Sequence, residues 1–334
     1  MLSLIGICLA TLVAAPVPEH RVVPITPENL DNLRPLPTLE RKASAIKLAP
    51  DGRRIAFVGL RKPAEILAPD LSEQLYKVGN DESVDFAFSH DPEVVAYSTI
   101  GGGVVVLNLR TEKEVHIDTS KGEAPFEAYK EFVNTVFSPD GKLLATGGYH
   151  TGAKVWDAKT GKLVRKLDMG KAEGGLTPVF SPDGKVLAVG HRNSKPRLFD
   201  AATGKVLHVL DETMSQGLAF SPDGKTLAIV YVDGIVVLWD VATGKRLAQA
   251  KSDAEELYDV SWSPDGRLLA TGGLKGSVTL WSPEGLKPLK RLAPPARWFN
   301  AVSFTPDGSQ LLVYGGGGKT KTPKVWRWGI RAAR

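Results

Sequence analysis

Apolar residues alternate with small or polar ones in short runs that recur along most of the chain. Residues that share one side of such a run include Phe86 and Phe88, Leu218 and Phe220, Val260 and Trp262, and Val302 and Phe304. A period of two is typical of a half-buried β-strand. A second apolar run follows after a few turn-forming residues, as at 143–146, 186–189, 226–229 and 268–271. The pattern predicts β-hairpins repeated along the chain.

A recurring turn sequence joins the two strands of each predicted hairpin. Its clearest form, Phe-Ser-Pro-Asp-Gly-Lys, occupies 137–142, 180–185 and 220–225, and degenerate copies occupy 48–52, 88–91, 262–267 and 304–308. Pro at the second position and Gly where φ is positive suit a tight turn. The serine position falls at residues 49, 89, 138, 181, 221, 263 and 305, in steps of 40, 49, 43, 40, 42 and 42. This period is that of a four-stranded propeller blade.

Two more strands follow the hairpin in each unit. A large side chain stands eighteen residues after each of the first six serine positions, at Leu67, Leu107, Trp156, Phe199, Trp239 and Trp281. Thr-Gly-Lys turns at 160–162, 203–205 and 243–245 then lead into a fourth strand. We therefore predict an all-β fold: a single seven-bladed β-propeller of four-stranded antiparallel blades over residues 36–330. Because the first two units diverge most, a six-bladed ring is the alternative.

The Trp-Asp pairs 156/157 and 239/240, the Phe-Asp pair 199/200 and the Ser-Pro-Asp-Gly turns resemble the WD-repeat β-propeller family, in a degenerate, bacterial, exported form. The resemblance implies that an N-terminal strand at 36–40 completes the last blade and closes the ring. The family's histidine before each turn is missing, and only Asp233 matches its acid before the Trp. We therefore expect most of the buried Asp-His-Ser/Thr-Trp network to be absent and apolar packing to stabilise the blades.

The N-terminal segment has a different composition. Residues 2–15 form an apolar run that is too short to span a bilayer but suits a signal peptide, although no Lys or Arg precedes it. We expect residues 1–15 to be a signal peptide or apolar leader that exports the chain to the periplasm or the extracellular space. A misassigned start would instead leave a cytoplasmic protein. Residues 16–35 contain several prolines and predict an extended linker without a helix; 331–334 form a C-terminal tail.

Charge and side-chain chemistry exclude several classes of site. The net charge of +5 is small for 334 residues, and Lys and Arg lie mostly one per turn beside Asp and not in runs, so we expect no nucleic-acid partner. The only cysteine, Cys8, lies in the leader. The six histidines are scattered, which favours polar surface loops, although His150 and His191 fall in equivalent hairpins of adjacent units. The glycine run at 315–318 lacks the spacing of a phosphate-binding loop. We expect no cofactor, no metal and no catalytic residue.

The predicted function is a non-enzymatic scaffold that binds a protein or peptide. In the family, the loops that enter the first strands share one face, called the top face, with the loops between second and third strands. The residues that we expect to contact a partner there are Glu82, Glu131, Met214, Glu256, Tyr258, Arg297, Trp298 and Phe299. Trp298 and Phe299 could equally pack in the last blade's core. The loop at 119–132 is either a specificity insertion or a decoration.

The charges of these loops predict a mildly acidic entrance and thus a cationic or neutral partner. We expect a monomer with no membrane insertion once the leader is removed. One alternative is a propeller enzyme of lactonase or hydrolase type with its site in the central channel. The residues expected to line that channel are mostly small or apolar, with Lys47 the exception. The other alternative is a TolB-like envelope component, but 16–35 is too short for the extra domain that it requires.

One residue tests the predicted strand order. Pro178 lies within the first strand of its unit. Proline has no N–H to donate, so within a sheet it is tolerated at an edge. We therefore predict that the first strand is the inner edge of each blade.

Overall fold

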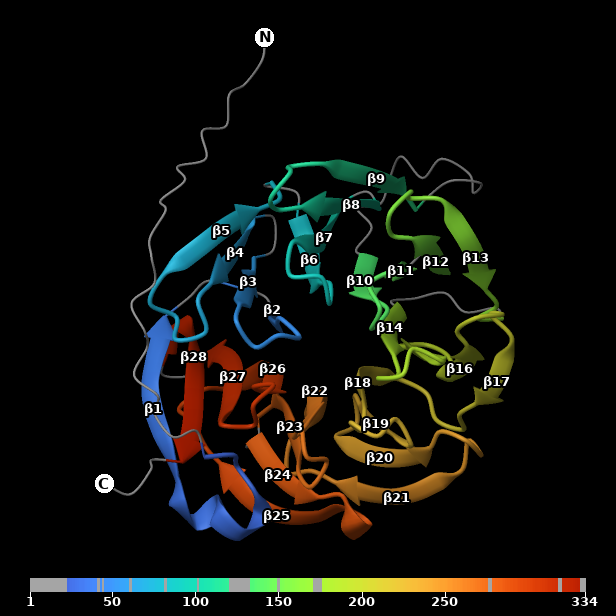
Figure 1. The fold of residues 1–334 in the computed structure, drawn as a ribbon. Coiled ribbons are helices and arrows are strands. Elements are labelled where there is room, and N and C mark those ends of the chain that lie inside the picture. Colours follow the sequence, from blue (N-terminus) through green and yellow to red (C-terminus); the bar gives the residue numbers. More distant parts are fainter. Residues whose placement is uncertain are drawn as a thin grey trace.

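The computed structural model describes residues 23–40, 43, 45–59, 62–80, 83–100, 102–119, 133–148, 151–170, 176–275, 278–317 and 320–330. Four-stranded antiparallel sheets stand around a central opening like the blades of a propeller (Figure 1). The predicted all-β propeller fold is confirmed. Among the described residues, no helix has the length and apolar character needed to cross a membrane.

Each of the seven repeated turns joins the first two strands of a four-stranded group. The first strands surround the central opening (Figure 1): β2 (Ala45–Leu48), β6 (Ser83–Phe88), β10 (Val133–Phe137), β14 (Leu176–Phe180), β18 (Ser215–Phe220), β22 (Glu256–Trp262) and β26 (Trp298–Phe304). The second strands are β3 (Ile55–Val58), β7 (Val94–Thr99), β11 (Leu143–Gly148), β15 (Val186–His191), β19 (Thr226–Tyr231), β23 (Leu269–Leu274) and β27 (Gln310–Gly317).

The third strands are β4 (Ala64–Leu67), β8 (Gly103–Asn108), β12 (Ala153–Asp157), β16 (Arg197–Asp200), β20 (Ile235–Asp240), β24 (Val278–Ser282) and β28 (Thr320–Ile330). The outer strands are β5 (Gln74–Val78), β9 (Glu114–Asp118), β13 (Leu163–Leu167), β17 (Val206–Val209), β21 (Arg246–Lys251), β25 (Lys287–Leu292) and β1 (Leu33–Glu40). Five sheets have four strands each, and a sixth has eight because Leu274 of β23 pairs with Trp298 of β26.

The repeated turns are closed by their own side chains. In the third copy, Ser138 Oγ donates to Asp140 Oδ1 over 2.6 Å and accepts from the Leu143 amide over 2.9 Å. Gly141 has a φ of 69°, a conformation that other residues adopt at a cost. The same bonds recur in the copies at Ser181, Ser221 and Ser263. The repeat is therefore a structural unit whose polar groups are satisfied locally.

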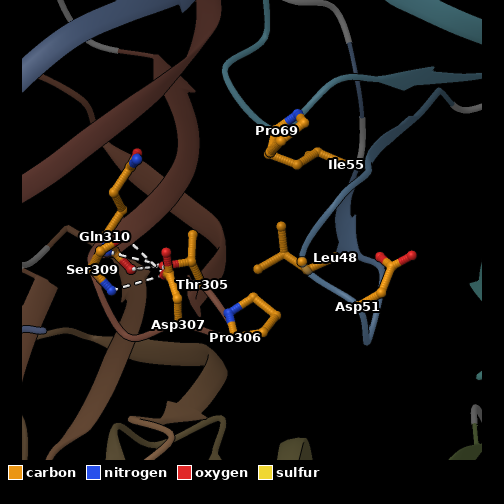
Figure 2. Close-up of a pocket in the computed structure, with 10 residues that line it drawn as sticks. Leu48, Asp51, Ile55, Pro69, Thr305, Pro306, Asp307, Ser309 and Gln310 are labelled. Atoms are coloured by element: carbon orange, nitrogen blue, oxygen red, sulfur yellow. Dashed lines mark hydrogen bonds between the residues drawn. The ribbon is translucent and has the colours of Figure 1, made fainter. Parts of the chain in front are cut away.

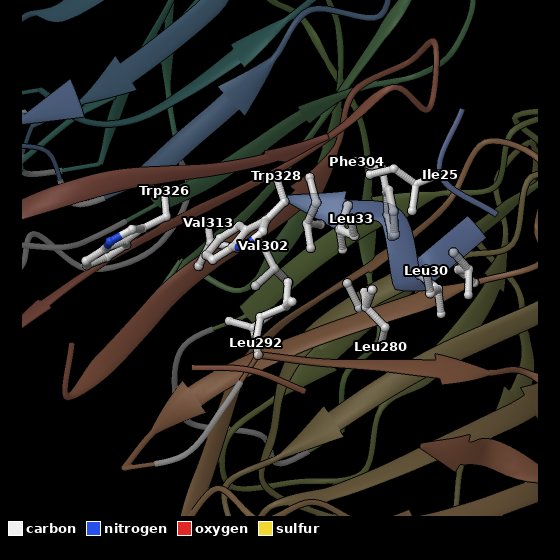
Figure 3. Packing of buried hydrophobic residues seen from close by; sticks show 14 of the residues in the cluster. Ile25, Leu30, Leu33, Leu280, Leu292, Val302, Phe304, Val313, Trp326 and Trp328 are labelled. Atoms are coloured by element: carbon white, nitrogen blue, oxygen red, sulfur yellow. The ribbon is translucent and has the colours of Figure 1, made fainter. Parts of the chain in front are cut away.

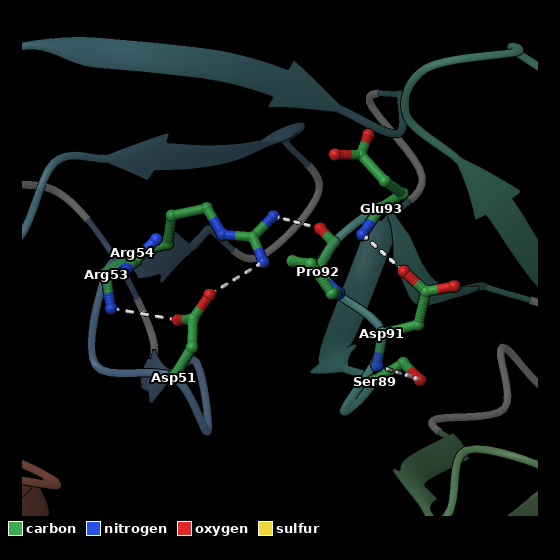
Figure 4. A network of polar contacts seen from close by, with 7 residues as sticks. All are labelled: Asp51, Arg53, Arg54, Ser89, Asp91, Pro92 and Glu93. Atoms are coloured by element: carbon green, nitrogen blue, oxygen red, sulfur yellow. Dashed lines mark hydrogen bonds and ion pairs between the residues drawn. The ribbon is translucent and has the colours of Figure 1, made fainter. Parts of the chain in front are cut away.

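Neighbouring turns pack on one another through the proline and glycine of the motif. A Cβ on Gly184 would stand 3.5 Å from Pro139 of the preceding turn, and one on Gly224 would stand 3.6 Å from Pro182. The turn at Ser89 and Asp91 has no glycine, and there Arg54 fills the space between this turn and the preceding one. Its buried guanidinium donates to the Pro92 carbonyl and lies 3.4 Å from Asp51 Oδ2 (Figure 4). It also stacks 5.4 Å from the centroid of the Phe88 ring.

The inner position of the first strands is confirmed by Pro178. This residue lies in β14, which pairs with β15 alone, and it stands opposite Val189. The missing N–H of Pro178 therefore interrupts no strand ladder.

The N-terminal segment packs against the last groups of strands. β1 pairs antiparallel with β28, from Leu33 opposite Ile330 to Glu40 opposite Lys324, so the strand expected at 36–40 starts three residues earlier. Before it, η1 (Pro27–Asn32) is a 3-10 helix, which a proline at its start favours. Ile25 and Leu30 are buried in a cluster with Leu280 and Phe304 (Figure 3). The extended linker expected at 16–35 is therefore wrong for residues 23–35, because these apolar side chains belong to the core.

Part of the family's polar network is present. Trp156 Nε1 donates to Thr146 Oγ1 over 2.8 Å, and Trp281 Nε1 donates to Thr271 Oγ1 over 2.9 Å. Trp239 has Ile229 at the corresponding place on the neighbouring strand. Elsewhere the buried clusters are apolar and combine side chains of adjacent sheets, as Ala188 and Leu198 do with Phe220 and Trp239.

Candidate functional site

The candidate site is the top face, at the strand ends opposite the repeated turns. Of its expected contact residues, Glu82 and Glu131 lie outside the described residues. The loop at 119–132 also lies outside them except for Thr119. The carbonyl of Thr119 accepts from Lys154 Nζ over 2.6 Å, and Lys154 is buried in β12. The described end of this loop is thus hydrogen-bonded to a side chain of β12.

Met214 is exposed on this face. Its side chain is an exposed large apolar group, with 53% of the residue accessible, and its φ is 64°. A left-handed conformation is uncommon for a bulky residue and stores strain, which often marks a functional position. The Met214 carbonyl accepts from the Val232 amide over 3.1 Å, which holds this conformation in place.

A polar cluster beside Met214 joins residues of three consecutive groups of strands: one from the loop after β15 and the others from the starts of β18 and β22. The Gln216 amide oxygen, turned toward Arg192, accepts from its Nη2 over 2.9 Å and its Nε over 3.3 Å. Burial raises the pKa of Tyr258, as does its hydrogen bond with the Glu256 carboxylate, while the positive charge of Arg192 lowers it. The four side chains therefore form one electrostatically connected group. We call Arg192, Gln216, Glu256 and Tyr258 the entrance cluster.

The sequence prediction named Glu256 and Tyr258 of this cluster but missed Arg192. Arg192 follows the buried end of β15, in the loop before β16. The signal that could have found it is a charged residue directly after a strand that ends in a buried histidine.

The three residues at 297–299 are divided between surface and core. Arg297 is exposed and Trp298 is half-buried, whereas Phe299 is completely buried and packs edge-on against Trp326, with 6.0 Å between the centroids. Trp298 packs edge-on against Tyr314, also at 6.0 Å. Phe299 is therefore a core residue, and its expected role as a partner contact does not fit the structure.

The glycine run has a packing role beside Trp298. A Cβ on Gly316 would come within 2.9 Å of the Trp298 ring, and one on Gly317 within 3.1 Å of its Nε1. These two glycines leave the space that the indole occupies.

The inner strands carry more charge than the sequence prediction expected. Lys47 Nζ lies 3.2 Å from Asp85 Oδ1. Asp85 Oδ2 in turn accepts from the Thr135 amide over 2.8 Å. The negative charge of Asp85 raises the pKa of Lys47. Lys47 therefore joins three adjacent inner strands, β2, β6 and β10, through one carboxylate.

Asp259 forms a second link of the same kind. Its Oδ2 accepts from the Val302 amide over 3.0 Å, and its Oδ1 accepts from its neighbour Val260 over 2.9 Å. Burial raises the pKa of Asp259 to about 6, although both hydrogen bonds and the charge of Lys47 act in the opposite direction. The inner wall therefore holds Asp85 and Asp259 as well as the expected Lys47.

The histidines do not all lie in surface loops. His191 is fully buried, and its Nδ1 accepts from the Asn193 amide over 2.8 Å. Burial lowers its pKa. His150, its expected neighbour, lies outside the described residues. Within the described ranges, no three His, Cys, Asp or Glu side chains are grouped as ligands for one metal ion.

A pocket of about 370 Å³ lies on the face of the repeated turns (Figure 2). It is bounded by the turn between β2 and β3 and the turn between β26 and β27. Asp51 and Asp307 both line it, but each accepts hydrogen bonds within its own turn, from Arg53 and from Thr305 and Ser309. Both carboxylates are therefore engaged in closing their own turns.

Two family models match parts of the chain. The WD domain, G-beta repeat model matches residues 123–157 and 245–282, and the anaphase-promoting complex subunit 4 WD40 domain model matches residues 175–216 and 211–258. No curated protein sequence matches the chain. The matched segments span the units that carry the clearest turns, and the sheets are arranged as a propeller. These matches support a WD-repeat β-propeller family for the chain.

Proposed function

We propose that this chain is a scaffold that binds a protein or peptide partner on its top face. WD-repeat proteins typically mediate protein–protein interactions and are typically not enzymes. The entrance cluster is the observation that carries the proposal. It combines the guanidinium of a loop residue with an amide, a carboxylate and a phenol near the starts of two inner strands, β18 and β22, and the strained and exposed Met214 lies beside it.

The chemistry of these groups suits an extended peptide. Met is a flexible apolar contact that adapts to different side chains, and Tyr and Arg supply much of the energy at interfaces. Glu256 and Arg192 carry opposite charges, so the described part of the cluster favours a neutral segment or one with a single cationic residue next to Glu256. Arg297 extends the surface, whereas Trp298 is already packed on Tyr314 and serves the fold as well.

Affinity capture with quantitative comparison of variants tests this function. The wild type, a Met214→Asp/Glu256→Ala variant and a Lys142→Ala control would each be incubated with the native extract. Lys142 is exposed on the face of the repeated turns, so its loss leaves the top face unchanged. The wild type and the control should capture the same partner. We expect the double variant to recover about tenfold less of it. Equal recovery by all three would remove the top face from consideration.

We also propose that the chain is exported, on the basis of the apolar run at 2–15. Cell fractionation and N-terminal sequencing of the recovered protein test this. A mature N-terminus close to residue 16 supports export, and a full-length chain in the cytoplasm contradicts it.

A further inference from the structure

The outer strand β17 differs in composition from the other outer strands. Within the described chain, each of the other outer strands contains at least one Lys, Arg, Asp or Glu, whereas β17 reads Val206-Leu207-His208-Val209. Natural proteins place charges or prolines on sheet edges because an unguarded edge pairs with other strands. β17 therefore lacks the charged and proline guards, and it retains only the bulge opposite Leu198 and Phe199 that β13 and β21 also have in their own pairs.

Its aliphatic side chains are exposed. Val206, Leu207 and Val209 have 39%, 43% and 49% of their surface accessible. Exposed Leu163 and Val164 on β13 extend this apolar surface, and the turn before β17 contacts β13, since a Cβ on Gly204 would meet Arg165 at 3.0 Å. The apolar surface thus follows two consecutive outer strands, which succeed one another around the rim in Figure 1.

The backbone of β17 also presents unpaired groups at the right spacing. β17 pairs with β16 alone. The Lys205 carbonyl accepts from the Asp200 amide, and the Leu210 amide donates to the Pro196 carbonyl, so both groups point inward. In a planar trans peptide the N–H and the C=O point in opposite directions. The Val206 N–H and the Val209 C=O therefore point away from the sheet.

We propose that β17 pairs antiparallel with β17 of a second copy of this chain, about a two-fold axis. The Val206 N–H donates to the partner's Val209 carbonyl, and the symmetry repeats this bond in the other direction. An uncharged strand meets no like-charge repulsion from its own copy. Lys205 flanks one end of the strand, and Asp211, whose Oδ1 is 2.5 Å from Lys195 Nζ of its own chain, flanks the other. This proposal departs from the monomer expected from the sequence.

The contact area of the proposed dimer is small, which limits its stability. Four residues from each chain bury much less than the roughly 1,200 Å² of a stable interface. We therefore expect a weak dimer that forms as the protein concentration rises.

Sedimentation velocity of the full chain over a wide range of concentration tests the proposal. The wild type should approach twice its 35.9 kDa mass at high concentration. Val209→Lys places a charge on the edge, and Val206→Pro removes the outward N–H, so both should remain monomeric. Leu247→Lys is the matched control, because Leu247 is 56% exposed on the outer strand β21. It should dimerise as the wild type does.

Three outcomes would overturn the proposal. A wild type that is monomeric at every concentration excludes the dimer. A Val206→Pro variant that still dimerises excludes the backbone pairing. A Leu247→Lys variant that loses dimerisation as fully as Val209→Lys shows that β17 is not the contact. Circular dichroism of each variant establishes that the fold is retained. A monomeric variant then results from the change at the strand edge and not from unfolding.

Discussion

Lys47 Nζ lies 3.2 Å from Asp85 Oδ1, and the other oxygen of that carboxylate accepts from the amide of Thr135. A lysine of β2, an aspartate of β6 and a backbone group of β10 are thus connected across three sheets. An inner strand has one free edge, and its outward N–H groups need acceptors. The aspartate of the preceding inner strand supplies one here, and Asp259 of β22 does the same for Val302 of β26.

Removing Asp85 should destabilise the protein more than removing Lys47. Asp85→Ala leaves the Thr135 amide and the lysine without their acceptor, and we expect a loss of about 2 kcal/mol. The Lys47 side chain is 38% exposed, so Lys47→Met should cost less than about 1 kcal/mol. Urea unfolding of both variants measures the difference. Equal losses would show that the aspartate does not act through Thr135.

Asn134 and Pro178 should be energetically coupled. Asn134 occupies the position in β10 that Asp85 occupies in β6, and its Nδ2 donates to the Leu176 carbonyl over 2.8 Å. Pro178 stands where Thr135 and Val302 offer an N–H, so an aspartate at 134 has no donor there.

A double-mutant cycle measures this coupling. Asn134→Asp alone should cost about 1–2 kcal/mol, because its carboxylate faces a carbonyl. In the Pro178→Thr background the new N–H can donate to it, and the cost should fall by about 1 kcal/mol. Additive losses would contradict the role assigned to this position.

The pH dependence of stability should reveal Asp259. Burial raises its pKa from 3.8 to about 6, so the folded state holds a proton that the unfolded state has already released. The stabilisation from this proton is complete below pH 3.8 and is lost as the pH rises through 6.

The comparison with Asp259→Asn isolates that effect from other carboxylates. The unfolding free energy of the wild type minus that of the variant should fall by about 2–3 kcal/mol between pH 4 and pH 7. Urea titrations at several pH values provide the measurement. A difference that stays constant over this range would mean that Asp259 titrates normally.

Arg54 should contribute more to stability than its neighbour Arg53. Arg54 is buried between two turns, where it donates to Pro92 and stacks on Phe88. Arg54→Met keeps much of the aliphatic volume but loses these contacts, and we expect a cost of about 2 kcal/mol. Arg53 is exposed, so Arg53→Met should change the unfolding free energy by less than about 0.5 kcal/mol. Thermal unfolding of the pair distinguishes them.

Sequence and structure agree where the chain repeats itself. The spacing from Ser138 to Ser181 and beyond predicted strands, turns and the inner edge at Pro178, because such features depend on local backbone preferences and on a period of two. The structure of the N-terminal residues was harder to predict, because prolines near position 27 indicated a linker. The burial of Ile25 and Leu30 depends on contacts with strands more than 200 residues away.

The candidate site was only partly accessible from the sequence. Met214, Glu256 and Tyr258 follow from their offset to the turns, but Phe299 has the same local signature as a surface aromatic and is buried. The contacts of Arg192, Asp85 and Asp259 are with residues of other units. A single repeat gives no information on which side chain of the next unit stands beside it.

The sequence by itself determined the repeated turns, the alternation of each strand and the family, because these are written within about 45 residues and need no distant partner. The tertiary structure decided which charges meet around the central opening, which aromatic residues are buried and which outer edge lacks protection. These depend on side chains that approach each other only when the units stack, and their energies are set by burial and by neighbours across the seams. Lys47 and Asp85, 38 positions apart in the chain and 3.2 Å apart in space, belong to this second group.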